Sequence, residues 1–497
     1  MKRIFLKSFR ICFVSSEVTP FAKTGGLADV SGSLGKYLSN AGHDLRIIMP
    51  LYSAMDTTKY KVQPVENAQD IKIWFGDIEV VYSMFTLKLP NSNADVYLIH
   101  SPHYYNRWSL YTNDQDEYLR FAILNRVAIE FCQLMDWTPD IFHCNDWQTG
   151  LIPLYLKTVY SWDKLFRKTK TVMTIHNIGY QGHFSADIIN KLGLERYYNW
   201  LDANELYQGK INYLRCGVLH ADKITTVSET YAKEILTDFY GEGLQNTLMA
   251  RKSDLVGILN GVDYDEWNPE TDNNIPFNYS VNDLTGKTKN KKKLLSQLGL
   301  AYSAKAPVIG LITRLADQKG IELFKGAIEK ILAEFNIRFI VLGSGEHSYE
   351  QYLYYLQQTF SNKVVFYLGY NFELSHLIEA GSDMFVMPSK YEPCGLNQIY
   401  SLKYGTVPIV RKTGGLADTV EFYNWETQEG TGFVFDHYNA DSLYWALQHA
   451  IQTFADQKAW KKLMIRGMQK DFSWDKQIPK YLKLYENLTM HRRIVLS

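Results

Sequence analysis

The stretch Lys23-Thr-Gly-Gly-Leu-Ala-Asp29 follows a short apolar run, and the same seven residues return as Lys412-Thr-Gly-Gly-Leu-Ala-Asp418 after another apolar run. A Gly-Gly pair lets the backbone turn sharply at the end of a strand and approach a ligand closely. The residues that follow open a helix whose free N–H groups face that ligand. Either copy alone is best interpreted as an ordinary strand-to-helix turn. Their identity predicts one structural device in two comparable halves, with an anion or a sugar hydroxyl as its ligand.

Short apolar runs recur along both halves of the chain, with helical patterns between them. Strands that alternate with helices predict parallel sheets with crossover helices, so two sets of runs predict two doubly wound, Rossmann-like domains of the α/β class. The first set comprises Ile11–Ser15, Leu45–Met49, Ile141–His143, Val172–His176, Ile224–Val227 and Val256–Leu259. The second set comprises Val308–Thr313, Phe339–Leu342, Val364–Leu368, Met384–Met387 and Val407–Val410.

Domain boundaries follow from the places where this alternation stops. Residues 263–306 lack the alternating pattern and are rich in Asn, Asp, Thr and Lys. We therefore expect an N-terminal domain over 1–262 and a C-terminal domain over 263–472. The last segment, 473–497, is expected to be an amphipathic helix that crosses back onto the first domain. Ligands of open α/β sheets bind beyond the carboxyl ends of the strands, so a deep cleft between two facing domains is the expected site.

Two local patterns complete the expected organisation. Ile71–Lys88 is expected to form an antiparallel hairpin with its turn at Gly76-Asp77. The basic run from Lys287 to Lys293 is expected to belong to a solvated connection with an early helix. No aromatic residues interleave with its lysines, which speaks against a nucleic-acid patch.

Composition excludes several classes of protein. The 497 residues are 46% hydrophobic and 21% charged, with 53 basic and 53 acidic side chains, so nothing indicates a nucleic-acid partner. Lys7 and Arg10 interrupt the apolar stretch of the N-terminus, and no run reaches the roughly 18 apolar residues of a membrane span. Five scattered cysteines without Cys-x-x-Cys spacing predict a reducing compartment, with neither disulfides nor a zinc site.

Polar residues follow two apolar runs of the first half. His143 and Asp146 could bind a metal or act in acid–base chemistry, although an Asp that caps the next helix is an equally good interpretation. The segment Thr174-Ile-His-Asn-Ile-Gly-Tyr-Gln-Gly182 places His176 and Asn177 at another strand end. A lone histidine is usually structural, but one beside an Asn and a tight turn favours contact with a ligand.

Two strand ends of the second half concentrate charge. Thr313-Arg-Leu-Ala-Asp-Gln-Lys-Gly320 sets Arg314 and Lys319 where a strand becomes a helix, a combination that fits a diphosphate better than two solvated surface charges. Pro388-Ser-Lys-Tyr-Glu-Pro-Cys-Gly-Leu396 holds Glu392 between a turn and a helix. A rigid carboxylate there suits sugar hydroxyls or a developing cation, although helix capping would also account for it.

Neither a metal nor another cofactor is expected. Asp-x-Asp, the pattern of metal-dependent glycosyltransferases, occurs at Asp114–Asp116 and Asp263–Asp265, but both copies lie in loop-like or linker sequence rather than at a strand end. A nicotinamide-dependent dehydrogenase would need Gly-x-Gly-x-x-Gly after the first strand, and this pattern is absent.

Taken in order, these motifs resemble those of the bacterial glycogen synthases and plant starch synthases over nearly the whole chain. Two positions depart from related patterns. Many members of the family have His at the position of Gln148. Related retaining transferases outside the synthase branch have a second Glu at the position of Tyr400, so its absence here is expected of a synthase. The matching motifs are the two heptapeptides, His176-Asn, Tyr180-Gln-Gly, Gly257-Ile-Leu-Asn-Gly-Val-Asp263, Arg314-Leu-x-x-Gln-Lys-Gly320 and Glu392-Pro-Cys-Gly-Leu396.

The resemblance implies a GT-B glycosyltransferase fold and a role for each matching position. The residues implied to be catalytic are His176, Glu392, Arg314, Lys319 and Asp146. Those implied to bind ADP-glucose are Lys23, Gly25, Gly26, Asn260, Arg314, Lys319, Tyr370, Glu392, Cys394, Gly395 and Leu396. Those implied to face the acceptor glucan are Asp29, Tyr105 and Asn177.

The implied reaction moves an α-glucosyl group from ADP-glucose to the non-reducing 4-OH of an α-1,4-glucan, glycogen or starch, with retention. The resemblance also implies action in the bacterial cytoplasm or at a glucan granule. Two alternatives stay open: a catalytically weak relative that only binds glucan, and a retaining transferase of the same fold that uses UDP-glucose. The intact Lys23, His176, Arg314, Lys319 and Glu392 speak against the first.

Overall fold

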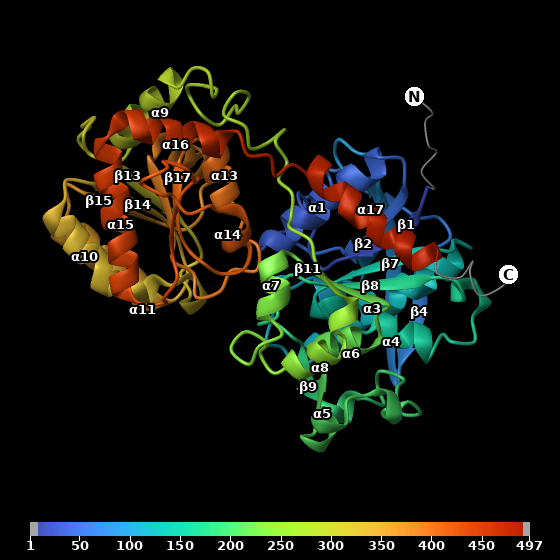
Figure 1. Cartoon of the computed structure of the whole chain (residues 1–497). Coiled ribbons are helices and arrows are strands. Elements are labelled where there is room, and N and C mark those ends of the chain that lie inside the picture. The colour runs from blue at the N-terminus through green and yellow to red at the C-terminus, as the bar shows by residue number, and fades with distance from the viewer. Residues whose placement is uncertain (1–7, 491–497) are drawn as a thin grey trace. The chain divides into compact units, whose positions relative to one another are not determined.

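The computed structural model describes residues 8–490 (Figure 1). Lys7 and the His491-Arg-Arg end of the chain lie outside the described residues. The chain divides into two compact units: unit 1 runs up to Val227 and adds Ala232–Gly261 and the chain from Trp474, while unit 2 comprises Ser228–Tyr231 and Val262–Ser473. Sequence placed the boundaries after residues 262 and 472, one residue from this division on each side. It did not foresee the short segment Ser228–Tyr231 in unit 2.

The sheet of unit 1 contains β1 (Arg10–Val14), β2 (Asp44–Pro50), β3 (Gln63–Pro64), β4 (Ile71–Phe75), β5 (Ile78–Lys88), β6 (Asp95–His100), β7 (Ile141–Asn145), β8 (Lys170–Ile175), β11 (Lys223–Thr226) and β12 (Leu255–Gly257). Its strand order is β12-β11-β8-β7-β1-β2-β6-β5-β3, with β4 paired to β5. The chain moves outward from β1 through β2 to β6 and then returns to β7, so the order reverses between β1 and β7. Such a switch point is where open α/β sheets bind ligands.

The predicted hairpin is confirmed, because β4 and β5 pair antiparallel with Phe75 opposite Ile78. A second, small antiparallel pair is formed by β9 (His183–Ser185) and β10 (Lys210–Asn212). The helices of unit 1 are α1 (Gly26–Asn40), α2 (Pro102–Tyr105), α3 (Glu117–Leu134), α4 (Ile152–Lys157), α5 (Ala203–Tyr207), α6 (Tyr213–His220), α8 (Gln245–Ala250) and α17 (Trp474–Met490), while α7 (Glu229–Glu234) begins in the segment assigned to unit 2.

The sheet of unit 2 contains β13 (Val308–Ile312), β14 (Arg338–Gly343), β15 (Val364–Leu368), β16 (Met384–Met387), β17 (Val407–Arg411) and β18 (Phe433–Phe435). All its pairings are parallel, in the order β15-β14-β13-β16-β17-β18. The chain runs from β13 out to β15 and returns to β16, so the switch point of this sheet lies between β13 and β16.

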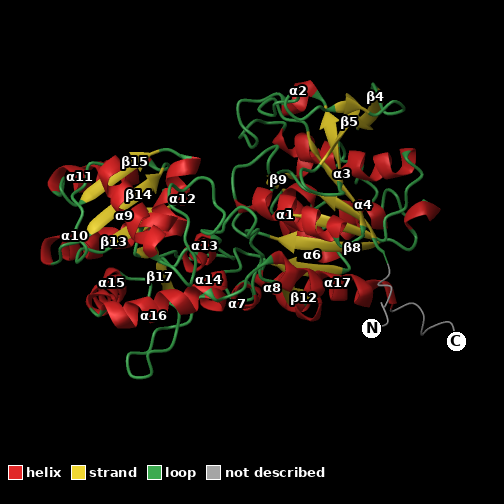
Figure 2. Ribbon diagram, turned by 90° about the horizontal axis from the view of Figure 1, so that it is seen from above, coloured by secondary structure: helices red, strands yellow, loops and turns green. Residues whose placement is uncertain are grey.

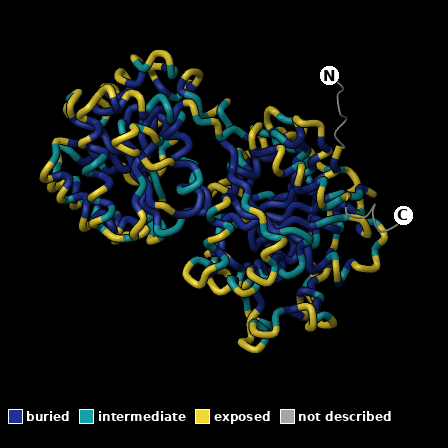
Figure 3. The backbone as a smooth tube through the Cα atoms, in the orientation of Figure 1, coloured by how far each residue is buried: buried dark blue, intermediate teal, exposed yellow. Residues whose placement is uncertain are grey.

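Helices cover both faces of this sheet (Figure 2), because neighbouring residues of its strands are buried on opposite sides. Ile309 and Phe339 pack with α10 (Phe324–Glu334), α11 (His347–Thr359) and α15 (Ala440–Ala455). Val308 and Ile340 pack with α9 (Thr285–Gln297) and α12 (Phe372–Gly381). Both sheets form the buried centre of their units (Figure 3). The remaining helices of unit 2 are α13 (Asn397–Lys403), α14 (Gly414–Thr419) and α16 (Gln457–Met468).

The basic run lies within α9, as expected, but the prediction that it is solvated is wrong for two of its lysines. Lys287 is buried and its Nζ donates to Thr406 Oγ1 at 2.7 Å, and burial lowers the pKa of Lys287 to about 7. Lys291 pairs with Asp383 at 2.6 Å. Over the described part of the chain, no helix is both long enough and apolar enough to cross a bilayer.

Candidate active site

Residues that follow β1 form the first part of the site in unit 1. Glu17 is only 2% exposed, and its carboxylate accepts hydrogen bonds from the N–H of Thr24, from Thr24 Oγ1 at 2.7 Å and from the N–H of Gly25 at 3.2 Å. The hydroxyl of Tyr111 donates to the same carboxylate at 2.5 Å. Glu17 therefore fixes the loop that leads into α1. Sequence reasoning missed it, although a carboxylate just beyond an apolar strand is the same signal that singled out Asp146.

The first heptapeptide forms an open start to α1. Lys23 Nζ lies 2.7 Å from Asp29 Oδ1, which also accepts from Thr19 Oγ1 at 3.2 Å. Gly25 has extended backbone and α1 begins at Gly26. A Cβ added at either glycine would meet nothing within 4 Å. The loop thus leaves space for a ligand, as predicted for this copy, while the N–H of Gly25 is engaged by Glu17.

Asp146 and His176 follow the adjacent strands β7 and β8. Asp146 Oδ1 accepts from the N–H of His176 at 2.7 Å and from that of Asn177 at 3.3 Å. Burial raises the pKa of Asp146 to about 7, against the lowering effect of these two N–H groups. The position of Asp146 in the left-handed region, at φ 55°, turns the chain so that its carboxylate can reach them.

His176 is held as a neutral imidazole. Burial lowers the pKa of His176 to about 3, and its Nε2 lies 3.0 Å from Asn145 Oδ1. The amide of Asn145 is oriented by its Nδ2, which donates to the carbonyl of Val14 at 2.9 Å. Because Asn145 Oδ1 can only accept, Nε2 of His176 carries the proton and Nδ1 is the acceptor. Nδ1 of His176 is therefore a neutral nitrogen that can accept a hydrogen bond.

Two predictions for unit 1 are corrected by burial. Tyr105, expected to face the glucan, is completely buried and its hydroxyl donates to the carbonyl of Arg120 at 2.7 Å, so it is a core residue. His143, a candidate for metal or acid–base chemistry, is completely buried between Tyr485 (2.6 Å) and Thr174 (2.7 Å). Burial lowers the pKa of His143 to about 3, and its contact with Tyr485 ties α17 to the sheet.

Asn260 and Gln148 are two of five amides whose buried side-chain oxygen has no hydrogen-bond partner among the described residues; the others are Gln245, Gln398 and Gln477. Asn260 is 4% exposed and Gln148 5%. A buried polar atom without a partner costs about 1–3 kcal/mol, and a ligand hydroxyl can offset that cost. The prediction that Asn260 contacts the transferred glucose is compatible with this feature, and Gln148 has the same capacity.

Arg314, Lys319 and Glu392 lie beside the switch point of unit 2. Arg314 follows β13, is exposed, and its guanidinium has no partner among residues 8–490. Lys319 Nζ lies 2.7 Å from Glu392 Oε2, which also accepts from Ser389 Oγ at 2.9 Å. The two side chains of the ion pair are 19% and 7% exposed. β13 and β16 are neighbours, so their loops bring two cations and a rigid carboxylate to one edge of the sheet.

The other predicted residues of unit 2 follow β15 and β16. Tyr370 follows β15 and is 66% exposed, so its ring is free to stack on a base. Cys394 is buried, Gly395 has φ +70°, and Leu396 precedes α13. The amide of Gln398 donates to the carbonyls of Cys394 at 3.1 Å and Gly395 at 3.0 Å, which fixes this turn.

The second heptapeptide differs from the first in conformation. Gly414 has φ +44° whereas its counterpart Gly25 is extended. A Cβ at Gly414 would overlap the carbonyl of Glu392, and one at Gly415 would overlap that of Cys394. The prediction of one device used twice is therefore wrong in its geometry. The first pair of glycines leaves room for a ligand, and the second lets the backbone of α14 pack against the segment that carries Glu392.

The Asp-x-Asp copies occupy loops, as predicted. Arg107 pairs with Asp114 at 2.8 Å and with Asp116 at 2.5 Å. The N–H of Asp265 donates to Asp263 Oδ1 at 3.1 Å. Within the described range, no group of three or more His, Cys, Asp or Glu side chains is arranged to hold a metal ion.

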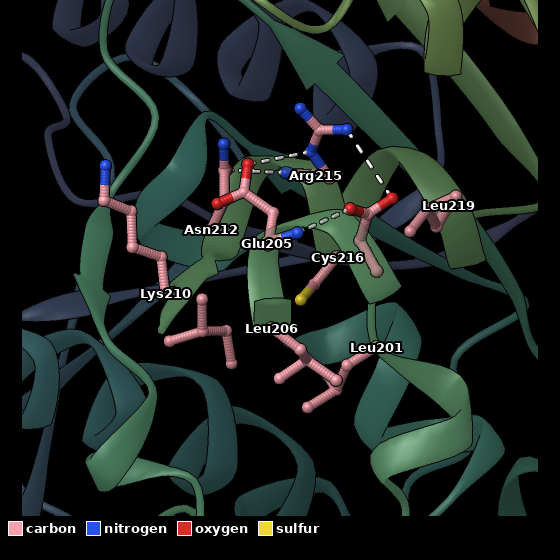
Figure 4. A pocket seen from close by; sticks show the side chains of 10 residues that line it. Leu201, Glu205, Leu206, Lys210, Asn212, Arg215, Cys216 and Leu219 are labelled. Atoms are coloured by element: carbon pink, nitrogen blue, oxygen red, sulfur yellow. Dashed lines mark hydrogen bonds and ion pairs between the residues drawn. The ribbon is translucent and has the colours of Figure 1, made fainter. Parts of the chain in front are cut away.

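A small recess in unit 1 contains none of the predicted site residues (Figure 4). Arg215 lies 3.2 Å from Glu205 and 3.6 Å from Asp202, and Asp202 also caps α5. The charged groups of the recess thus pair with one another. Its lining residues are Leu201, Asp202, Glu205, Leu206, Lys210, Ile211, Asn212, Arg215, Cys216 and Leu219.

Comparisons with known proteins agree over the full chain. Residues 10–250 match the starch synthase catalytic domain and residues 300–463 match glycosyl transferases group 1. Glycogen synthase of Geotalea daltonii is 43% identical over 480 residues, covering 96% of this chain and 98% of the relative. Glycogen synthase of Thermosipho melanesiensis is 42% identical over 490 residues, covering 98% of this chain and 100% of the relative.

Solved structures are similar as well, including two that cover nearly the whole chain. The catalytic domain of starch synthase IV from Arabidopsis thaliana, bound to ADP and acarbose, is 33% identical with a TM-score of 0.89, and the match covers 97% of this chain and 100% of that one. Sucrose-phosphate synthase from Thermosynechococcus elongatus is 17% identical with a TM-score of 0.59, covering 96% and 98%, and shares the fold.

Proposed function

The chain belongs to the glycogen and starch synthase family, and from that premise we propose that it transfers the α-glucosyl group of ADP-glucose, with retention, to the non-reducing 4-OH of an α-1,4-glucan. Family membership makes it a glucan-synthesising glycosyltransferase with the GT-B fold. The choice of donor is supported by the starch synthase IV structure, which contains ADP. The observation that carries the proposal is the cluster of Arg314, Lys319 and Glu392 at the switch point of unit 2.

Arg314 and Lys319 are proposed to stabilise the leaving diphosphate. Negative charge on the diphosphate grows as the glycosidic bond breaks, so fixed cations bind the transition state more tightly than the ground state. Lys319 is held in place by Glu392 before any ligand arrives, which lowers the cost of orienting it. Arg314 has a free guanidinium that can grip two phosphate oxygens at once. Tyr370 is proposed to stack on the base.

Glu392 is proposed to act on the glucosyl group as a fixed charge rather than as a nucleophile. Its Oε2 accepts hydrogen bonds from Lys319 and Ser389. A double displacement through a glycosyl-enzyme would need a free carboxylate nucleophile. We therefore infer departure and attack on one face of the sugar, with the leaving phosphate accepting the proton of the acceptor hydroxyl.

Unit 1 is proposed to orient the transferred glucose and the acceptor. Neutral His176 offers Nδ1 to a sugar hydroxyl, Asn260 offers its unpartnered oxygen, and Asp146 orients the backbone of His176 and Asn177. Lys23 and the open start of α1 at Gly26 are proposed to meet the donor phosphates, and Asp29 the acceptor. No metal or other cofactor is proposed, because cations and helix starts of the chain itself can meet the phosphate charge.

The place of action is proposed to be the cytoplasm or the surface of a glucan granule. The five cysteines are buried and none forms a disulfide within residues 8–490, which fits a reducing compartment.

The proposal is tested by donor competition. Purified protein is given labelled ADP-glucose or UDP-glucose with glycogen, with and without excess EDTA. We expect transfer from ADP-glucose, a much lower kcat/KM for UDP-glucose and no effect of EDTA. Preference for UDP-glucose would support the alternative donor. Glycogen binding without turnover would support the non-catalytic alternative, and loss of activity in EDTA with recovery in manganese would overturn the metal-free proposal.

A further inference from the structure

One group of four aromatic rings lies on the surface of unit 2, apart from the residues of the candidate active site. Phe422 and Trp425 lie in the loop after α14, and Trp445 and His449 lie one turn apart on α15. We refer to these four residues as the aromatic platform. Phe422 is 45% exposed, Trp425 41% and Trp445 37%. Single exposed aromatic residues need no explanation, but several large rings gathered at one place indicate a binding surface.

The rings of the platform hold one another in fixed orientations. Trp425 stands at 79° to Phe422, with centroids 5.6 Å apart, and at 85° to Trp445, with centroids 6.1 Å apart. Phe422 and Trp445 are within 11° of parallel at 6.4 Å. The ring of His449 lies 4.4 Å from that of Trp445. Because edge-to-face packing already limits the rotation of these rings, they lose little conformational entropy when a ligand binds.

The loop that presents Phe422 and Trp425 is itself anchored. Tyr423, between them, is buried, and its N–H donates to the carbonyl of Gly432 at 2.8 Å. Asn424 Oδ1 accepts from the N–H groups of Glu426 at 2.8 Å and Thr427 at 3.1 Å. Trp425 Nε1 donates to Thr453 Oγ1 on α15 at 3.4 Å, which ties the loop to the helix. These hydrogen bonds fix the position of the loop that carries Phe422 and Trp425.

Charge around the platform restricts the ligand. The loop carries Glu421, Glu426 and Glu429, and Lys470 pairs with Glu421 at 2.5 Å. Two more cations contact the loop: Lys462 donates to Gln428 at 3.3 Å and Arg466 donates to the carbonyl of Gly430 at 2.9 Å. Three carboxylates and three cations leave no excess of positive charge that would select a nucleotide or another anion. The carboxylate oxygens accept hydrogen bonds from hydroxyl groups. Rings bordered by such acceptors therefore fit an uncharged polyhydroxylated ligand with apolar C–H faces, which is the chemistry of a sugar chain.

We propose that the aromatic platform is a second binding site for α-1,4-glucan. The α-1,4 linkage makes a chain curve, and rings at nearly right angles match a curved chain better than the flat ribbon of a β-1,4-glucan. The inference rests on the glucan acceptor of the proposed function. A polymer held at the platform raises the local concentration of its chain ends for the same enzyme molecule, whereas a trisaccharide is too short to gain from a second contact.

The test compares Trp425→Ala/Trp445→Ala with the wild-type protein, and uses Trp162→Ala as a control. Trp162 lies in unit 1 and is 72% exposed. We expect the double variant to lose retardation in native gels containing glycogen and to raise KM for glycogen about tenfold or more. Its kcat, its KM for ADP-glucose and its KM for maltotriose should stay unchanged. Trp445→Phe should keep most of the retardation, and cello-oligosaccharides should not compete.

The outcomes separate the platform from the proposed function. If the wild type fails to extend maltotriose, the proposed function has failed. If maltotriose is extended and the double variant keeps wild-type glycogen retardation and KM, the platform proposal is wrong. A variant that shifts from oligomer to monomer in light scattering, with unchanged glycogen affinity, would assign the rings to self-association and also overturn it. Equal melting temperatures exclude misfolding as the cause of a loss, and Trp445→Phe tests the ring itself if the double variant is unstable.

Discussion

Substituting the matching glycine in each heptapeptide should give opposite results, although the local sequences are identical. At Gly415, an added Cβ would overlap the carbonyl of Cys394 and lie 2.5 Å from its Cα, whereas real Cβ atoms are essentially never closer than 3.0 Å to such a neighbour. The nearest atom, the carbonyl oxygen of Cys394, would lie 2.1 Å from this Cβ, so the backbone has to open by about 0.9 Å, and the neighbour that moves is the segment carrying Glu392. At Gly26, an added Cβ meets nothing within 4 Å.

The magnitudes follow from these contacts. Overpacking of this kind costs about 1–3 kcal/mol, which corresponds to about 2–4 °C of melting temperature for each kcal/mol in a domain of this size. Displacement approaching 1 Å at a catalytic group can lower a rate about a hundredfold. Gly415→Ala should therefore lower both kcat and the melting temperature. Gly26→Ala should keep or slightly raise stability, because Ala is favoured over Gly in a helix by about 0.5–1 kcal/mol. It should raise KM for ADP-glucose if the donor phosphates approach this helix start.

The assay is thermal unfolding together with steady-state kinetics in ADP-glucose at saturating glycogen. Gly415→Ala with wild-type kcat and melting temperature would refute the idea that this glycine positions Glu392. Destabilisation by Gly26→Ala would refute the open geometry of the first copy. If Gly26→Ala keeps the wild-type KM for ADP-glucose, the proposal that the start of α1 binds the donor phosphates is wrong.

Three further predictions concern single side chains. Burial raises the pKa of Asp146 to about 7, so ionisation of its carboxyl group destabilises the folded state. The melting temperature of Asp146→Asn, relative to that of the wild type, should therefore rise between about pH 4 and pH 7 and level off above pH 7. A difference that does not change with pH would contradict the raised pKa. Tyr105→Phe should cost about 1 kcal/mol of stability through its lost bond to the carbonyl of Arg120, with no change in KM for glycogen; a raised KM would restore Tyr105 as an acceptor residue. Lys319→Ala should lower kcat more than it raises KM, and should be strongly non-additive with Glu392→Gln because it leaves a buried carboxylate without its cation; additive losses in a double-mutant cycle would show that the pair is not coupled.

Local sequence was sufficient to predict the architecture. Alternating apolar runs and helical patterns predicted most of the parallel strands, and polar residues beyond strands predicted where Asp146, His176, Arg314 and Glu392 would lie. The runs missed β6 and β18, and the sheet of unit 1 is mixed because β5 pairs antiparallel with β6 and β3. This works because a central parallel strand is buried on both faces and reads as a continuous apolar run. The hairpin of β4 and β5 was also predictable, since its turn is encoded by two adjacent residues.

What sequence could not provide depends on contacts between distant segments. The two heptapeptides differ in conformation because the second packs on the backbone of Glu392–Cys394, which no local pattern encodes. Lys287 and Lys291 can be buried because Thr406, in the turn before β17, and Asp383, just before β16, accept from their ammonium groups. Tyr105 is buried for a similar reason, its hydroxyl being satisfied by α3.

The central claim, elongation of an α-1,4-glucan with retention, is tested most directly by the product of one reaction. The protein is incubated with ADP-glucose and maltotriose, and the products are separated and examined by proton NMR. We expect maltotetraose with a new α-1,4 linkage and one ADP released for each glucosyl unit transferred. A β-linked tetrasaccharide, a new branch at another hydroxyl, or ADP release matched only by free glucose would contradict the account.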